Sequence, residues 1–418
     1  MDIKLKTVLN FKERYPGFVY DDIRLIQEAS NPRLEVKVVA RKGSKGTCSG
    51  CGKKRPGYDR LKQREFIHVP LWGITVLLLY CMRRLQCPTC GVVVETVPWS
   101  TGKSPLTTSY AWFLSQWAQL LSMKEVGRQF KLSWHYVFTA VSMAVSWGRK
   151  RMDLNDITAI GIDEIHWAKN SFMTLVYQID NHCKRLLWCS EGRTQASING
   201  FFTWFGEERS QLIQFACSDM WKPYLNAIKT YATNAFNILD RFHVSQKLNK
   251  AIDKVRAQET KSLIAQGKEV VLKHSRWTLL KNPENLTEHQ KVKLKDLLHC
   301  NLKTIRAYLL KEDFKHFWTY QSATWAGKFL EQWCTQVMRS KLEPMKQVAK
   351  TIRAHKSLLL NWFEVKNQIS LGAVEGLNNK AKVVTRKSYG FKTPEMLKMA
   401  LYHQLGRLPV PEIAHKYF

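Results

Sequence analysis

The sequence predicts a multidomain α+β protein, in which small domains follow one another along 418 residues. Three observations predict this class. Two Cys-x-x-Cys pairs lie in a basic N-terminal region, strand and helix patterns alternate from Ile157 onward, and the segment from His243 to Ile369 has an almost wholly helical pattern. A chain of this length exceeds one ordinary hydrophobic core and suggests roughly two to four domains.

Composition and charge restrict the functional class. Hydrophobic residues make up 45% of the chain, with 15 Trp and 19 Phe, which favours folded domains over disorder. The formal net charge of +31 repels itself in a compact state, and nucleic acid is the usual compensating partner. The sequence contains neither an apolar run long enough to cross a membrane nor a secretory signal in Met1–Arg14. We therefore expect no membrane partner and no disulfide framework among the ten cysteines.

The two cysteine pairs predict a zinc ribbon within residues 1–100. Four thiolates on two tight turns suit one tetrahedral Zn²⁺, and the long gap between the pairs leaves room for strands. The predicted ligands are Cys48, Cys51, Cys87 and Cys90. A redox pair is the alternative, although no thioredoxin-like unit surrounds either motif. Cations flank the pairs and are expected to contact DNA phosphates: Lys53, Lys54, Arg55, Arg83 and Arg84.

Residues 101–152 predict a helix-turn-helix domain. Helical patterns cover Pro105–Leu121, Met123–Phe130 and Trp134–Gly148, and the last two are joined by a turn of about three residues. Such a pair places its second helix in the DNA major groove, with Lys131 and His135 as expected DNA contacts. Any small helical bundle shows a similar pattern, so the basic neighbouring domain favours the DNA-binding interpretation.

From Ile157 the pattern is three strands, a helix, a strand, a helix and a strand. These elements are Ile157–Ile165, Phe172–Asp180, Arg185–Glu191, Gln195–Arg209, Leu212–Asp219, Met220–Ala232 and Ala235–Asp240. This is the order of a ribonuclease-H-like α/β core, a mixed sheet flanked by helices. We expect its first part at 153–254, an all-helical insertion at 255–365, and its last part at 366–418, with the helix Pro394–Gly406 packed back on the core.

Two aspartates are candidate metal ligands. Asp163 lies in the middle of the first strand, on the same face as the small Ala159 and Gly161, which leave room above the sheet. A charge in so apolar a strand is best explained by a metal ion, the alternative being a neighbouring Arg or Lys. Glu164 points to the opposite face and is a poorer candidate. Asp219 ends the fourth strand, where it either caps the next helix or faces Asp163 across neighbouring strands.

The helix predicted at 371–386 has two neighbouring faces. Its apolar stripe comprises Val374, Leu377, Ala381 and Val384, while Glu375 lies beside polar and cationic residues. With the two aspartates, Glu375 completes three oxygen ligands that suit two Mg²⁺ or Mn²⁺ ions, whereas the alternative is an ordinary solvated helix. Four cations of the same segment are expected to contact DNA close to the predicted metal site: Lys380, Lys382, Arg386 and Lys387.

Four sequence blocks resemble the ISL-three family of bacterial insertion-sequence transposases. They are Gly161–Glu164, Ser218–Tyr224, Leu239–Val244 and Val374–Lys380, and the resemblance covers nearly the whole chain. It implies a DDE transposase whose catalytic triad is Asp163, Asp219 and Glu375. Asp240 and His243 form a family mark near the active site, with either a functional or a purely structural role.

The resemblance also implies what the protein would do. A member of this family would bind the terminal inverted repeats of its element, cut their ends with Mg²⁺, and join the freed 3′-hydroxyls to double-stranded target DNA. It would act in the bacterial cytoplasm, associated with the nucleoid, as a homodimer or larger assembly on paired ends.

Two alternatives belong to other classes. A DNA-binding regulator would keep the zinc and helix-turn-helix domains without needing three intact acids, and a structure-specific nuclease of the same fold would cut without strand transfer. The tryptophans of the insertion are candidates for stacking on a displaced base, against the alternative of core packing: Trp277, Trp318, Trp325 and Trp333.

Overall fold

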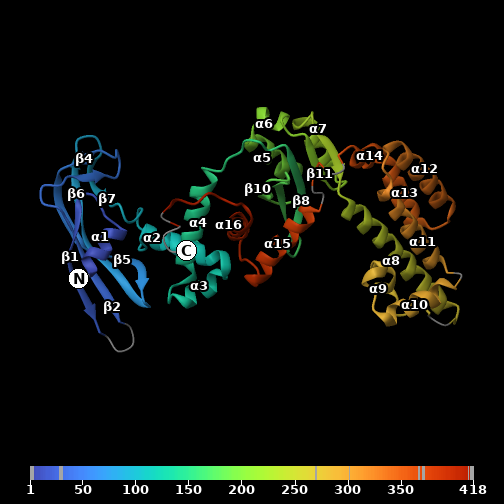
Figure 1. Cartoon of the computed structure of the whole chain (residues 1–418), viewed down its shortest axis with the longest axis horizontal. Helices are drawn as coiled ribbons and strands as arrows, with labels where there is room; N and C mark the ends of the chain where they lie inside the picture. Colours follow the sequence, from blue (N-terminus) through green and yellow to red (C-terminus); the bar gives the residue numbers. More distant parts are fainter. Residues whose placement is uncertain are drawn as a thin grey trace. The chain divides into compact units, whose positions relative to one another are not determined.

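A computed structural model describes residues 4–27, 32–268, 271–300, 302–365, 368–369, 372–412 and 414. The chain divides into two compact units, and Figure 1 labels most of their elements. The N-terminal unit comprises Met1–Met152 and Arg386–Phe418, and the central unit comprises Asp153–Thr385. Within the described ranges, no helix combines the length and the apolar character needed to span a membrane.

The N-terminal unit begins with helix α1 (Leu5–Lys12) and a seven-stranded sheet in the order β1-β2-β6-β7-β3-β4, with β5 paired to β6. Its strands are β1 (Phe18–Ile26), β2 (Arg33–Ala40), β3 (Gly46–Cys48), β4 (Lys54–Arg55), β5 (Gly57–Leu71), β6 (Ile74–Cys87) and β7 (Gly91–Thr96). Most side chains of β6 are buried or half-buried. Trp99 packs edge-on against Phe18, Phe66 and Tyr80, which closes the core of this sheet.

Helices α2 (Thr108–Leu120), α3 (Met123–Gln129), α4 (Trp134–Arg149) and α16 (Pro394–Leu405) complete the N-terminal unit. Ser122 and Glu125 form a capping box at the start of α3, and a short turn leads from α3 into α4. The predicted helices are confirmed. The expectation that the last helix packs on the sheet of the core is corrected, because α16 packs on α4, with Arg149 4.2 Å from the ring centre of Tyr402.

The central unit contains a five-stranded sheet in the order β10-β9-β8-β11-β12. Strands β8 (Ala159–Ala168), β9 (Ser171–Gln178) and β10 (Arg185–Glu191) are antiparallel, whereas β11 (Phe215–Ser218) and β12 (Phe236–Leu239) continue parallel to β8. The fourth strand therefore lies beside the first, as predicted. One predicted helix is wrong: Gly206, with φ of +92°, separates α5 (Gln195–Phe205) from α6 (Glu207–Gln211). Helix α7 (Lys222–Tyr231) follows β11.

The helical part of the central unit begins with a 25-residue helix, α8 (Arg241–Ala265). The predicted border between residues 254 and 255 thus falls inside α8. The other helices are α9 (Arg276–Leu280), η1 (Pro283–Asn285), α10 (Glu288–Leu298), α11 (Lys303–Phe314), η2 (Lys315–Thr319), α12 (Ala323–Arg339), α13 (Glu343–Ala354), α14 (Lys356–Glu364) and α15 (Ala373–Lys387). Phe314, Phe317 and Trp333 are fully buried in this helical part.

Candidate active site and cysteine cluster

Asp163 is buried on the central strand β8, where helix α15 crosses the sheet. The crossing is close at Gly161, because a Cβ atom there would lie 2.3 Å from Cγ2 of Val374. The room expected above Gly161 is therefore filled by the apolar stripe of α15. The same approach brings Asn378 to Asp163: its Nδ2 donates to Oδ2 of the carboxylate, and its Oδ1 accepts from the hydroxyl of Tyr177 at 2.7 Å.

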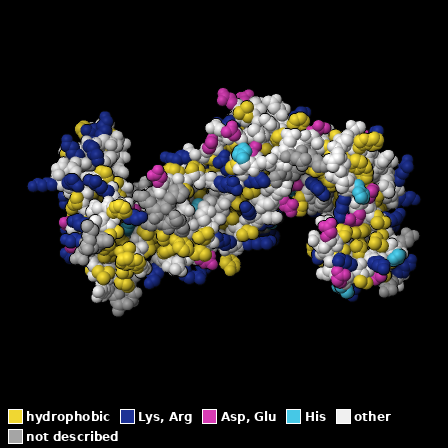
Figure 2. Space-filling model, viewed as in Figure 1, with side chains coloured by type: hydrophobic (Ala, Val, Ile, Leu, Met, Phe, Trp, Pro, Cys, Tyr) yellow, Lys and Arg dark blue, Asp and Glu magenta, His cyan; other side chains and the backbone are white. Residues whose placement is uncertain are grey.

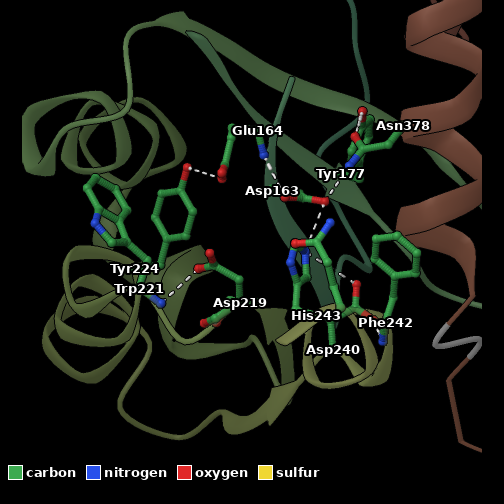
Figure 3. Close-up of polar contacts among 12 residues, drawn as sticks. Asp163, Glu164, Tyr177, Asp219, Trp221, Tyr224, Asp240, Phe242, His243 and Asn378 are labelled. Atoms are coloured by element: carbon green, nitrogen blue, oxygen red, sulfur yellow. Dashed lines mark hydrogen bonds and ion pairs between the residues drawn. The ribbon is translucent and has the colours of Figure 1, made fainter. Parts of the chain in front are cut away.

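Asp240 and His243 lie against Asp163 (Figure 3). Asp240 caps the N-terminus of α8 by accepting from the backbone N–H of Phe242 at 2.8 Å, which directs His243 of the first helical turn toward the sheet. Nε2 of His243 is 3.5 Å from Oδ2 of Asp163 and 3.9 Å from Oδ2 of Asp240. One ligand atom from each of the three residues lies within 4.8 Å of the others.

The electrostatics of this cluster reflect crowded negative charge. Burial raises the pKa of Asp240, and the charges of Asp163 and Glu375 raise it further. Burial by itself lowers the pKa of His243, but Asp163 and Asp240 outweigh it and raise the pKa above the ordinary value. A divalent cation would offset this charge, and carboxylate oxygens with an imidazole nitrogen form a suitable donor set, so the residues present fit a metal ion.

Asp219 follows strand β11, beside β8. The last paired residues of the two strands are Gly161 and Cys217, and each aspartate lies two residues further along the chain. Oδ1 of Asp219 accepts from the backbone N–H of Trp221 at 2.9 Å, and Oδ2 accepts from Arg193 at 2.9 Å. Asp219 therefore closes a turn ahead of α7 but does not cap that helix, whose N-cap is Trp221, and it lies at the end of the neighbouring strand.

Glu164 and Arg193 form a part of the site that sequence reasoning missed. Arg193 is 3.2 Å from Oε1 of Glu164 and also holds Asp219, while its guanidinium lies 4.7 Å from the ring centre of Trp221. Burial, then the charge of Asp163, raises the pKa of Glu164 to about 7. Strand alternation correctly separates the faces of Asp163 and Glu164, but no local signal brings Arg193, beyond the end of β10, to both acids.

Glu375 is exposed in the first turn of α15. It lines a cavity of about 820 Å³ to which Asp240 and Arg241 also contribute. The predicted apolar stripe of α15 is confirmed, since Val374, Leu377 and Ala381 are buried. The structure therefore groups Asp163 with Asp240 and His243, and brings Glu375 beside Asp240 along the cavity. Asn378, whose role the sequence did not indicate, joins α15 to the group.

The four predicted cysteine ligands also converge. One sulfur atom from each of Cys48, Cys51, Cys87 and Cys90 lies within 4.8 Å of the others. Gly50 permits this approach, because a Cβ there would be 2.7 Å from the sulfur of Cys90. The gap between the pairs holds β4, β5 and most of β6, in agreement with the expectation that strands fill it.

The thiols have divergent acidities. Burial opposes ionisation of Cys87, but the backbone N–H groups of Cys90 and Thr89 lower its pKa to about 6. Burial and the neighbouring sulfurs raise the pKa of Cys90 to about 12. Four sulfurs this close ionise together only with a cation among them, so the donor set fits a thiophilic metal.

Three of the expected DNA contacts are engaged within the protein. The expectation that Arg83 contacts DNA is wrong, because Arg83 is buried in a salt bridge with Glu95 at 2.7 Å and so is not available to phosphates. The guanidinium of Arg55 lies beside Cys87 and Cys51, which raises its pKa. Lys387 donates to the carbonyls of Gln119 and Leu120 at the end of α2, where the helix dipole favours a cation.

The other expected DNA contacts are accessible. Lys54 is exposed and donates to Thr47, and Arg84 forms an exposed pair with Asp59. The remaining accessible side chains are Lys53, Lys131, His135, Lys380, Lys382 and Arg386. Figure 2 shows Lys and Arg side chains spread over the visible face of the molecule.

Comparison with known proteins extends these findings. Residues 160–401, which include all six acidic and imidazole residues of the candidate site, match the ISL3 family of DDE transposases, described as transposase. The transposase for insertion sequence element IS1001 of Bordetella parapertussis is 28% identical over 353 residues, which span 83% of this chain and 86% of that protein. The transposase for IS1557 of Mycobacterium tuberculosis H37Rv is 26% identical over 430 residues, 96% of this chain and 95% of the relative.

Proposed function

The chain belongs to the ISL3 family of DDE transposases, and from this premise we propose that it cuts the ends of its own insertion sequence and joins them to target DNA. The single observation that carries the proposal is the convergence of Asp163, Asp240 and His243 on the central sheet, with Asp219 at the end of the neighbouring strand. Membership of this family implies DNA substrates and a divalent metal. We propose that this DNA cleavage and joining take place in the bacterial cytoplasm, at the nucleoid.

A ribonuclease-H-like core is the fold we infer for this site. The strand order β10-β9-β8-β11-β12, with three antiparallel strands followed by two parallel ones, supports it. In this architecture the first and fourth strands end side by side, so acids from distant segments meet. The helical segment between β12 and α15 interrupts the core and would act as its insertion domain.

Asp163, Asp219 and Glu375 are the proposed catalytic carboxylates, and they would hold Mg²⁺ or Mn²⁺. When bound, such ions activate the attacking water or 3′-hydroxyl and stabilise the leaving 3′-oxygen. Asp240 and His243 would complete the polar wall beside Asp163. Asn378 orients the carboxylate of Asp163 through its hydrogen bond, and Tyr177 fixes Asn378 in turn.

Arg193 would have to release Asp219 for that carboxylate to serve a metal. The pair is half-buried, and an incoming divalent cation would replace the guanidinium as the neutralising charge. A freed Arg193 would still pair with Glu164 or contact a DNA phosphate.

End recognition is assigned to the N-terminal unit. Helices α3 and α4 have the lengths and short connection of a helix-turn-helix, and Lys131 and His135 are exposed at its turn and recognition-helix start. We propose that the cysteine cluster holds one structural Zn²⁺ and that Lys53, Lys54 and Arg84 contact phosphates nearby. On α15, Lys380, Lys382 and Arg386 would hold DNA near the chemistry.

The test of the proposed function uses labelled duplex DNA that carries one terminal repeat and its flank. Purified protein with Mg²⁺ should nick at the repeat end and join the freed 3′-hydroxyl to a target duplex, and Asp163→Asn should abolish both products while still shifting the DNA in a gel. Cleavage that survives Asp163→Asn would refute the site. Cleavage without joining would identify a nuclease, and binding without either product would identify a regulator.

Zinc is tested by elemental analysis of the purified chain. About one Zn²⁺ per chain is expected, because four thiolates form one tetrahedral site. Cys48→Ser should lose the metal, whereas the control Cys81→Ser, on β6 outside the cluster, should retain it. A folded wild-type protein without zinc would refute the assignment.

A further inference from the structure

The cavity beside Asp240 and Glu375 has a lining that the metal chemistry does not require. It lies between the N-terminal end of α8 and the helical part of the central unit, and its volume of about 820 Å³ is within the range of pockets for small organic ligands. Arg241 and Phe242 line it and lie in sequence between Asp240 and His243. The entrance therefore adjoins the candidate catalytic cluster.

Aromatic and planar groups form much of this lining. Trp318 and Trp362 contribute buried rings, whose centres are 5.4 Å apart. Phe242 is 43% exposed, although it is a large apolar side chain at the start of a helix. The guanidinium of Arg241 lies 5.4 Å from the ring centre of Trp318. Exposed rings and guanidinium planes are surfaces on which unstacked bases stack.

Polar groups of the lining suit the edge of a base. Asn249 belongs to it, and its buried Oδ1 has no hydrogen-bond partner among the described residues. A buried amide left unpaired costs stability, so a ligand that supplies the missing partner gains affinity. Ser245 and Asn282 add further donors and acceptors.

One cation of the lining, Arg241, can receive an anionic group, although the carboxylates of Asp240, Glu284 and Glu375 also line the cavity. Lys311 donates to the carbonyl of Leu279 and forms a salt bridge with Glu312, each at 3.0 Å, and Lys315 also pairs with Glu312. Arg241 has no ion pair within the described part of the chain, so its charge is available to a phosphate.

From these features we propose that the cavity takes one unstacked nucleotide of the DNA end, next to the phosphate that is cut. The inference rests on the proposed function, since it assumes DNA at the cluster of Asp163. A phosphate there brings the adjoining nucleotide to Arg241 and Phe242, and its base enters the cavity against the exposed ring of Phe242. Unstacking a base costs a few kcal/mol, which the stacking and hydrogen-bonding surfaces of the pocket offset.

Only one of the four tryptophans singled out in the sequence fits this role. Trp318 lines the cavity, whereas Trp333 is in the core and donates to the carbonyl of Leu310 at 2.8 Å. Trp277 and Trp325 are exposed but outside the lining.

The experiment places 2-aminopurine, one position at a time, beside the cut phosphate in a terminal-repeat duplex that is already nicked. Binding of the full-length protein in EDTA should change the fluorescence at one position only, as that base leaves the stack. Phe242→Ala should abolish the change, and Trp325→Ala, the matched aromatic control, should keep it. Phe242 is exposed, so its loss leaves folding intact.

A second measurement distinguishes the loss of base binding in the cavity from a general loss of activity caused by the substitutions. Phe242→Ala and Trp318→Ala should each slow cleavage about tenfold or more, the worth of one base stacked on an aromatic ring. An abasic site at the responding position should restore much of the loss, because no base then needs a platform. Wild-type cleavage without a fluorescence change, or variants that the abasic duplex does not rescue, would overturn the cavity proposal alone. Absence of cleavage by the wild type on every duplex would instead overturn the proposed function.

Discussion

Asn378 is the residue through which α15 reaches the first carboxylate of the site. It is buried, donates to Asp163 and accepts from Tyr177, so its amide is held at both ends. Hydrogen bonds to charged groups are worth about 1.5–3 kcal/mol, and partners that orient metal ligands alter metal affinity by roughly 10–100-fold.

Asn378→Ala should therefore lower the rate of DNA cleavage by roughly 10–100-fold and require more Mg²⁺ for half-maximal rate. The measurement is a Mg²⁺ titration of cleavage, with thermal unfolding recorded in parallel. Asn379→Ala is the matched control, because Asn379 is exposed on the same helix and should leave the unfolding temperature unchanged. An Asn378 variant with wild-type Mg²⁺ dependence would contradict the orienting role.

Two adjacent arginines on β6 have opposite roles. Arg83 is buried against Glu95, which also accepts from Tyr80, whereas Arg84 pairs with Asp59 at the surface. Arg83→Met should destabilise the N-terminal unit by about 3–5 kcal/mol, because it leaves a buried carboxylate unpaired. Arg84→Met should cost less than about 1 kcal/mol. Denaturant unfolding measures both, and equal losses would contradict this assignment.

At the residue scale, strand alternation and strand ends indicated the two aspartates of the site. Asp163 has small neighbours on its own face, and Asp219 follows an apolar strand, so both were predictable. Periodicity assigns a side chain to a face but does not identify its partner. The sequence did not reveal that Arg83 pairs with Glu95, which lies on another strand, so Arg83 was expected to contact DNA. The contacts of Arg193 and Asn378 likewise arise only from tertiary packing.

At the scale of elements, α16 carries a titratable group into the N-terminal unit. His403 is buried, and its backbone carbonyl accepts from Gln119 at 2.8 Å. Burial, then the charge of Lys387, lowers the pKa of His403 to about 4. The folded state keeps this imidazole neutral, while the unfolded chain protonates it near its ordinary pKa of about 6.5.

The stabilising contribution of a neutral His403 is therefore fully present above about pH 6.5 and is lost as the pH falls toward about 4, up to roughly 3 kcal/mol. His403→Leu should flatten the stability profile of the N-terminal unit across this window. Thermal unfolding at a series of pH values measures it. An unchanged slope in His403→Leu would show that this imidazole does not titrate as its burial implies.

Local signals predicted most elements but not their assembly. Caps and periodicity placed α3, α4 and α15 within a few residues, and the patterns after Ile157 placed the five strands of the central sheet. The division at residue 254 was misplaced, because α8 runs unbroken from Arg241 to Ala265 and contains no Pro or Gly that would mark a border. The packing of α16 on α4 joins segments more than 240 residues apart, which periodicity alone does not encode.

For the whole molecule, the net charge of +31 opposes association of free chains and favours binding to DNA. Each phosphate neutralised releases counterions, so affinity for a terminal repeat should fall steeply with salt. About 6–10 phosphate contacts would cost roughly 10³–10⁵ in affinity between 50 and 200 mM salt. Because two free chains repel each other, they are expected to approach only when DNA phosphates neutralise part of their positive charge.

Joining two element ends in one reaction needs one catalytic cluster for each end, and each chain carries a single grouping of Asp163, Asp240 and His243 in its described residues. We therefore expect two 48.7 kDa chains on a paired-end DNA and a smaller assembly without DNA, because the phosphates screen the repulsion between chains. Mass photometry at low salt, with and without terminal-repeat duplex, distinguishes these states. A synaptic complex that contains one chain while both ends react would refute the dimer, since one cluster would then have to serve both ends in turn.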